Sequence, residues 1–174
     1  YYFIVYDMRY YAKNDQVILA DIKDVFPKFM GDYPSHPYTT LIKNGLYGLS
    51  NIKQGQKVID VNLPDLAGKP HSISELSKGK IALIDFWGSW CGPCIAVSRT
   101  MLPVYQEFKD KGFTILGIAK EYKTTKNLAI AFTREKYPWV NLVEMDDKNQ
   151  VWNKFGIVNT TGSVMLLDIE GKII

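Results

Sequence analysis

The fold is decided by one stretch in the middle of the chain: Ile81-Ala82-Leu83-Ile84-Asp85-Phe86-Trp87-Gly88-Ser89-Trp90-Cys91-Gly92-Pro93-Cys94. Its first seven residues are an almost unbroken apolar run, which is typical of a parallel strand buried on both faces. Residues 95–109, which follow the stretch, have the pattern of a helix. The only two cysteines of the chain therefore lie at a junction between a strand and a helix, with Cys91 at the helix N-terminus.

Two cysteines at such a junction predict a redox pair. The unpaired N–H groups and the positive end of the helix dipole favour a thiolate, so we expect a lowered pKa for the Cys91 thiol and a role for Cys91 as nucleophile. Cys94, one helical turn further on, is placed to attack the mixed disulfide and release the partner. Pro93 fits the first turn of the helix, where its missing N–H costs no hydrogen bond.

Asp85 is the one charged residue in the apolar run, six positions before Cys91. An ionised carboxylate is costly to bury, and burial would raise the pKa of this group. A carboxyl group with a raised pKa could relay a proton to or from Cys94, which makes Asp85 a candidate acid and base. The alternative is a structural carboxylate that caps a helix or pairs with a lysine.

Residues 85–94 resemble thioredoxin, including the Gly92-Pro93 dipeptide between the cysteines. Three flanking segments are similar to the TlpA/ResA group of bacterial thiol-disulfide oxidoreductases, which is related to the AhpC/TSA family: 54–58, 63–69 and 73–80. The resemblance covers residues 55–174. It implies a thioredoxin-like α/β fold, in which helices flank a central mixed sheet. It also implies a protein-disulfide reductase that has no cofactor or metal and works through the Cys91–Cys94 disulfide.

The loop opposite the cysteines departs from this family. The family has a cis-proline there, and the corresponding residue in this chain is Gly162 or Thr161. We expect the loop Thr161-Gly162-Ser163 still to face the substrate, with looser selectivity, because glycine does not enforce a cis bond. On the cysteine side, the resemblance implies that Trp90, Gly92 and Pro93 shape the substrate surface and tune the redox couple.

The helix after the cysteines departs as well. ResA-like members have a glutamate shortly after the second cysteine, and this chain has Val97 at that position counted from Cys94, or Met101 counted back from Pro103. The role of the glutamate therefore cannot be carried over. Asp85 is left as the nearest acid.

Composition excludes several other classes of protein. The chain has 174 residues, of which 47% are hydrophobic, enough for the core of one domain with an appendage. Its net charge of +3, with the two signs intermixed, is too small an excess to argue for nucleic-acid binding. No apolar run approaches the roughly eighteen residues of a membrane span. His36 and His71 lack ligand spacing, so the cysteine pair does not predict a zinc site.

The N-terminal part lies outside the resemblance and predicts a helical extension. Helices are expected over residues 1–14, 17–30 and 38–52, and Pro27 should kink or shorten the second. We therefore expect two domains, a helical extension with linker at 1–54 and a thioredoxin-like domain at 55–174. The extension resembles a helical segment of longer TlpA-like proteins. It is either a dimer or partner surface, or a spacer that packs on its own domain.

The remaining segments fit the thioredoxin order of elements. A β-hairpin is expected over 58–69, followed by an exposed His71 and a capping box at Ser72. Strands are expected at 112–119, 141–145 and 164–168, and helices at 126–136 and 148–155. The last helix of the fold is missing, so we expect either a C-terminal truncation or N-terminal helices that take its place on the sheet. The chain also starts without Met or a signal peptide, as a piece of a longer protein would.

The resemblance implies a reductant of disulfides in extracytoplasmic proteins. It places the protein in the bacterial periplasm or cell envelope, with an upstream electron donor and a membrane tether outside this sequence. The Gly-Pro dipeptide favours a potential near that of thioredoxin, about −270 mV, over that of DsbA, about −120 mV. Two alternatives stay open: a thioredoxin-fold binding module with little catalysis, and a thioredoxin-like peroxidase. The Pro-x-x-x-Thr-x-x-Cys context of a peroxidatic cysteine is absent.

Overall fold

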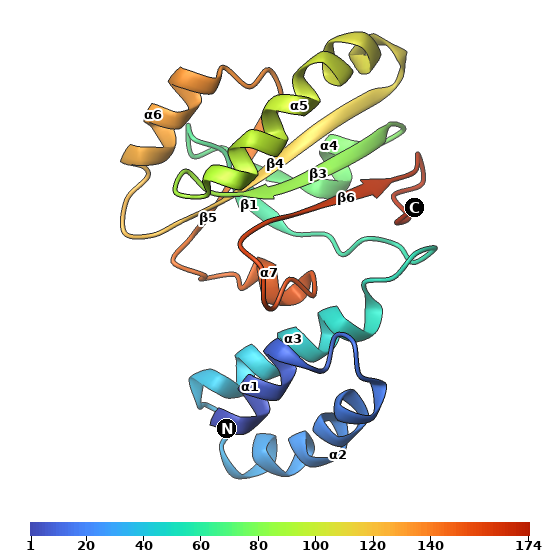
Figure 1. The fold of residues 1–174 in the computed structure, drawn as a ribbon, viewed down its shortest axis with the longest axis vertical. Helices are drawn as coiled ribbons and strands as arrows, with labels where there is room; N and C mark the ends of the chain where they lie inside the picture. The colour runs from blue at the N-terminus through green and yellow to red at the C-terminus, as the bar shows by residue number, and fades with distance from the viewer. The chain divides into compact units, whose positions relative to one another are not determined.

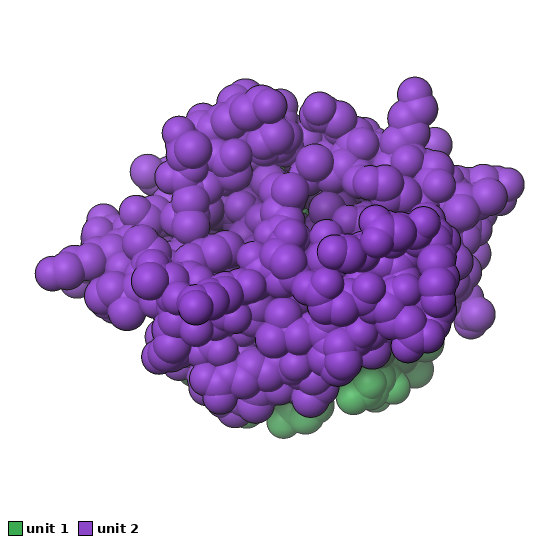
Figure 2. Space-filling view, turned by 90° about the horizontal axis from the view of Figure 1, so that it is seen from above, with its two compact units in different colours: residues 1–53, 150–160 green, residues 54–149, 161–174 purple.

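Residues 1–174 are all described by the computed structural model, which separates into two units (Figure 2). The first unit consists of residues 1–53 and 150–160, and the second of residues 54–149 and 161–174. The segment 150–160, which the sequence analysis assigned to the thioredoxin-like domain, thus groups with the N-terminal helices. Both cysteines and the loop at residues 161–163 belong to the second unit.

The second unit is built on a four-stranded mixed sheet (Figure 1). Its strands are β3 (Ile81–Trp87), β4 (Phe113–Glu121), β5 (Val140–Met145) and β6 (Ser163–Leu167), in the order β5-β4-β3-β6. The strands β3, β4 and β5 are parallel, whereas β6 runs antiparallel to β3. The register sets Asp85 between Gly117 on β4 and Val164 on β6.

Helices α5 (Gly92–Phe108) and α6 (Lys126–Glu135) pack on one face of this sheet. Side chains alternate along a strand, so Leu83, Asp85 and Trp87 share the face that α5 covers. The core on this face joins residues of the sheet to both helices: Trp87, Ile95, Met101, Ile115, Ala119, Leu128, Ala131, Tyr137, Trp139 and Val143. Asp85 is therefore directed into an apolar layer. The mixed sheet flanked by helices confirms the predicted fold class.

The rest of the second unit follows the predicted order. The hairpin has short strands, β1 (Asn62–Pro64) and β2 (Pro70–Ser72). Ser72 caps α4 (Ile73–Ser77), because its Oγ accepts the N–H of Glu75 at 3.1 Å. A 3-10 turn, η1 (Lys109–Lys111), joins α5 to β4. The prediction of an exposed His71 is wrong: its side chain is 11% exposed and lies 3.2 Å from the carboxylate of Asp65.

The first unit is helical, as predicted. It contains α1 (Tyr2–Tyr10), α2 (Gln16–Asp32), α3 (Pro37–Asn51) and the short α7 (Val151–Lys154). The first three helices and Ala12, in the turn after α1, form an apolar core: Ile4, Met8, Ala12, Leu19, Ile22, Phe26, Ile42 and Leu46. Of the two effects predicted for Pro27, a kink or a shorter helix, the shortening does not occur, since α2 continues to Asp32. None of the helices in the structure has both the length and the apolar character that crossing a bilayer requires.

Candidate active site

The cysteine pair lies at the start of α5, as the sequence predicts. Cys91 is the N-cap residue, and its Sγ accepts the N–H of Cys94 at 3.3 Å. A disulfide joins the two residues, whose Cα atoms are 5.3 Å apart. Cys91 is only 4% exposed, whereas Cys94 is partly exposed. The first cysteine thus has the hydrogen-bond donor that stabilises a thiolate, but in the oxidised protein its sulfur is nearly covered.

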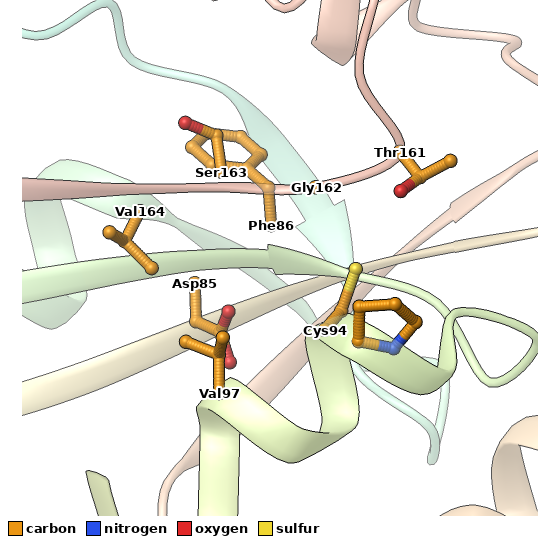
Figure 3. Close-up of a pocket in the computed structure, with 9 residues that line it drawn as sticks. Asp85, Phe86, Cys94, Val97, Thr161, Gly162, Ser163 and Val164 are labelled. Carbon is orange, nitrogen blue, oxygen red and sulfur yellow. The ribbon is translucent and has the colours of Figure 1, made fainter. Parts of the chain in front are cut away.

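A cavity of about 260 Å³ opens beside Cys94. Figure 3 shows the Cys94 sulfur pointing from the start of α5 toward the backbone at Gly162. The residues that line the cavity come from β3, α5 and the start of β6: Asp85, Phe86, Pro93, Cys94, Val97, Thr161, Gly162, Ser163 and Val164. Val97 and Val164 are about half exposed. The cavity therefore has apolar walls, a sulfur on one side and a carboxyl group at Asp85.

Asp85 is 2% exposed and has one close partner. The hydroxyl of Ser98, one turn after Cys94, donates to Asp85 Oδ2 at 2.6 Å, with the carbonyl oxygen of Cys94 3.0 Å away as a second acceptor. Burial raises the pKa of Asp85 to about 6, although the Ser98 hydrogen bond acts to lower it. The carboxyl group can therefore change its charge near neutral pH, in the same cavity that Cys94 lines.

Sequence reasoning missed Ser98. It is completely buried and lies on the side of α5 that faces the sheet. A serine four residues after Cys94 projects from the same helix face as Cys94, and this spacing was the one available signal. No local pattern shows that its hydroxyl meets Asp85.

The loop opposite the cysteines lies against both sulfurs. Thr161 Oγ1 is 3.4 Å from Cys91 Sγ. The chain has no cis peptide bond, so the bond before Gly162 is trans. A Cβ atom at Gly162 would lie 2.5 Å from the carbonyl oxygen of Phe86 and 2.6 Å from Cys94 Sγ. The sequence singled out this loop, and the structure brings it to the disulfide through a glycine that allows the close approach.

Gly162→Ala is expected to destabilise the oxidised protein by about 1–3 kcal/mol, because the added methyl overlaps a backbone oxygen and a fixed sulfur. The reduced protein should lose less stability, since a free Cys94 thiol can rotate away from the added methyl group. The reduction potential should then rise, by about 30 mV for each 1.4 kcal/mol of difference. Thermal unfolding of both redox forms and a glutathione titration measure the two effects. Gly92→Ala is the control for stability, because a Cβ there meets nothing within 4 Å; equal melting temperatures for the two variants would contradict the argument.

The other residues of the motif lie at the surface beside the pair. Trp90 is 46% exposed, and its Nε1–H donates to the carbonyl oxygen of Lys120 at 2.9 Å. Gly92 and Pro93 are exposed at the first turn of α5. The positions predicted to shape the substrate surface are therefore accessible.

The histidines lie in structural positions. His36 caps α3, where its Nδ1 accepts the N–H of Tyr38 at 3.2 Å, and its ring stacks on Tyr1. His71 pairs with Asp65. No group of three or more His, Cys, Asp or Glu side chains is arranged to hold a metal ion.

Comparison with known proteins identifies the family. The model of the AhpC/TSA family matches residues 54–174. The thiol-disulfide oxidoreductase ResA of Bacillus subtilis is 29% identical over 128 residues, which is 73% of this chain and 68% of ResA. ResA of Bacillus thuringiensis subsp. konkukian is 27% identical over 120 residues; that match covers 69% of this chain and 66% of the relative, slightly under two thirds of its length.

Solved structures agree with this assignment. The thioredoxin domain of a thiol-disulfide oxidoreductase from Bacteroides vulgatus is 30% identical, with a TM-score of 0.64 over 70% of this chain and 86% of that one. A thiol:disulfide interchange protein from Bacteroides sp. is 31% identical, with a TM-score of 0.63 over 71% of this chain and 80% of that one. Residues 54–174, which contain the disulfide and the loop opposite it, are similar to thiol-disulfide oxidoreductases. The chain therefore belongs to the AhpC/TSA family.

Proposed function

We propose that the protein is a thiol-disulfide oxidoreductase that reduces disulfides of client proteins through Cys91 and Cys94. One observation carries the proposal: the two cysteines form a disulfide at the start of α5, where the Cys94 N–H already points at Cys91 Sγ. A thiolate at Cys91 would receive the same hydrogen bond and the field of the helix.

The reaction then runs in two exchanges. The Cys91 thiolate attacks one sulfur of the client disulfide, forms a mixed disulfide and releases the first client thiolate. Cys94 loses its proton and attacks the Cys91 sulfur, which releases the second client thiolate and leaves the Cys91–Cys94 disulfide. The client gains two electrons and the enzyme loses two. A dithiol donor restores the enzyme by the reverse exchanges.

Asp85 is proposed as the group that takes the proton of Cys94. Two observations support this role: the carboxyl group lines the same cavity as Cys94, and burial gives it a pKa of about 6. Ser98 holds one carboxylate oxygen. At neutral pH Asp85 is then mostly ionised and ready to accept a proton within an apolar environment.

Client and location are proposed from the resemblance to the TlpA/ResA group. We place the protein outside the cytoplasm, in the periplasm or cell envelope, where a dithiol donor would keep the pair reduced. The half-exposed Val97 and Val164 on the cavity walls suit a client segment with an apolar side chain near its cysteine. Trp90, Thr161 and Gly162 are proposed to contact the same segment.

The reduction potential of the Cys91–Cys94 couple tests the function. Equilibration with defined glutathione or dithiothreitol mixtures, followed by tryptophan fluorescence, is expected to give a value nearer about −270 mV than about −120 mV. A reduction potential near about −120 mV would indicate an oxidant or isomerase. Absence of a reversible couple, together with no turnover of a model disulfide, would overturn the proposal and favour a binding module.

A further inference from the structure

The turn that joins β3 to α5 is held to the end of β4 by two hydrogen bonds. The backbone N–H of Ser89 donates to Glu121 Oε1 at 2.7 Å, and Trp90 Nε1–H donates to the carbonyl oxygen of Lys120 at 2.9 Å. Gly88 permits the close packing, since a Cβ there would lie 2.8 Å from the Trp90 ring. Cys91 is the next residue of the chain, and its N–H donates to the carbonyl oxygen of Gly88 at 3.0 Å. The position of Cys91 thus depends on how this turn is held.

Glu121 is the only residue in these contacts that binds the turn through a carboxylate side chain. It is 3% exposed at the last position of β4. Its own backbone carbonyl accepts the N–H of Asp146, which fixes the end of the strand to the loop after β5. A buried carboxylate is costly unless it is hydrogen-bonded, and hydrogen bonds to charged groups are stronger than neutral ones. Neither the exchange reaction nor the proton transfer described above uses this group.

We propose that Glu121 is a positioning residue for Cys91: its carboxylate holds Ser89, and through the turn it keeps the Cys91 sulfur at the N-terminus of α5. The inference rests on the proposed role of Cys91 as nucleophile. Glu121 acts on the position of Cys91 through its hydrogen bond to Ser89 and not through a contact with the disulfide. The charge of Glu121 could also act through space with the opposite sign, because a negative charge disfavours a thiolate. The two effects can be separated by substitution.

Two substitutions make the separation. Glu121→Gln removes the charge and keeps an oxygen that can accept the Ser89 N–H, whereas Glu121→Ala removes both. We measure the rate of iodoacetamide alkylation of the reduced protein at pH 7 and the exchange of the Ser89 amide hydrogen. Glu107→Ala is the control, because Glu107 is an exposed glutamate on α5 whose side chain is 62% exposed.

If Glu121 positions Cys91, the alanine variant should alkylate about tenfold more slowly and lose about tenfold in Ser89 amide protection, which is a typical effect of losing a charged hydrogen bond. The glutamine variant and the control should stay within about threefold of wild type, because a neutral hydrogen bond is retained or the site is untouched. Faster alkylation of both variants would show an effect of charge alone and overturn the proposal. Wild-type rates in a folded alanine variant would overturn it too.

Glu121→Asp covers the case in which the alanine variant does not fold. It keeps the carboxylate on a shorter side chain, so slower alkylation supports the proposal and a wild-type rate contradicts it. The measurements also distinguish this inference from the proposed function. A wild-type protein without a reversible couple or turnover would refute the function, whereas the Ser89 amide exchange reports the hydrogen bond regardless of turnover.

Discussion

Cys94→Ser is expected to trap client proteins in a stable mixed disulfide with Cys91. Without the second thiol the intermediate cannot be resolved, so turnover of a model disulfide should fall to the rate of the uncatalysed exchange. Reduced variant is mixed with a peptide that contains one disulfide, and the adduct is measured by mass spectrometry with and without dithiothreitol. We expect an adduct of one peptide per chain that dithiothreitol removes.

Cys91→Ser is the matched variant. It should form little adduct and show no turnover, because Cys94 lies inside the first turn of α5 and its own N–H donates to the sulfur of Cys91, not to the sulfur of Cys94. The structure also allows the opposite roles for the two cysteines. Cys91 is 4% exposed, and the cavity opens at Cys94. If Cys91→Ser forms the adduct and Cys94→Ser does not, the assigned roles are reversed and Cys94 is the residue that meets the client.

Local sequence was sufficient to predict the elements around the disulfide. The apolar run of β3, the cap at Cys91 and Pro93 in the first turn are properties of neighbouring residues, and β3 and α5 formed where expected. The capping box at Ser72 is equally local. Such signals need no knowledge of the rest of the fold.

The contacts that complete the site could not be predicted, because they join distant parts of the chain. Ser98 meets Asp85 across 13 residues, and Ser89 meets Glu121 across 32. His71 was misjudged for a similar reason, since its partner Asp65 lies on the other side of the hairpin turn. The loop at Gly162 was located only through the resemblance. Its tight approach to Cys94 depends on the antiparallel pairing of β6 with β3, which no short pattern encodes.

Asp85→Asn is expected to make the oxidised protein more stable at neutral pH. The pKa of Asp85 is about 6 in the folded protein and about 3.9 in an unfolded chain. The folded state therefore binds the proton more tightly, and stability falls as pH rises from about 4 to about 6. The loss amounts to about 3 kcal/mol above that window. Asp85→Asn should therefore raise the free energy of unfolding by an amount of this order at pH 7 and change it little at pH 4. Urea unfolding at the two pH values measures this. Asp110→Asn, at an exposed position, should show no such difference.

The same substitution should slow the reaction while it stabilises the fold. Wild-type turnover is expected to rise with pH through about 6, as Asp85 becomes able to accept the Cys94 proton; Asp85→Asn should lack this inflection and turn over about 100-fold more slowly at pH 7. Ser98→Ala gives a second check with a definite sign. Its hydroxyl acts to lower the pKa of Asp85, so its loss should move the inflection to higher pH without abolishing it. If Asp85→Asn is stabilised but keeps the wild-type pH profile, Asp85 only destabilises the fold and does not accept the proton. Solvent would then accept the proton of Cys94.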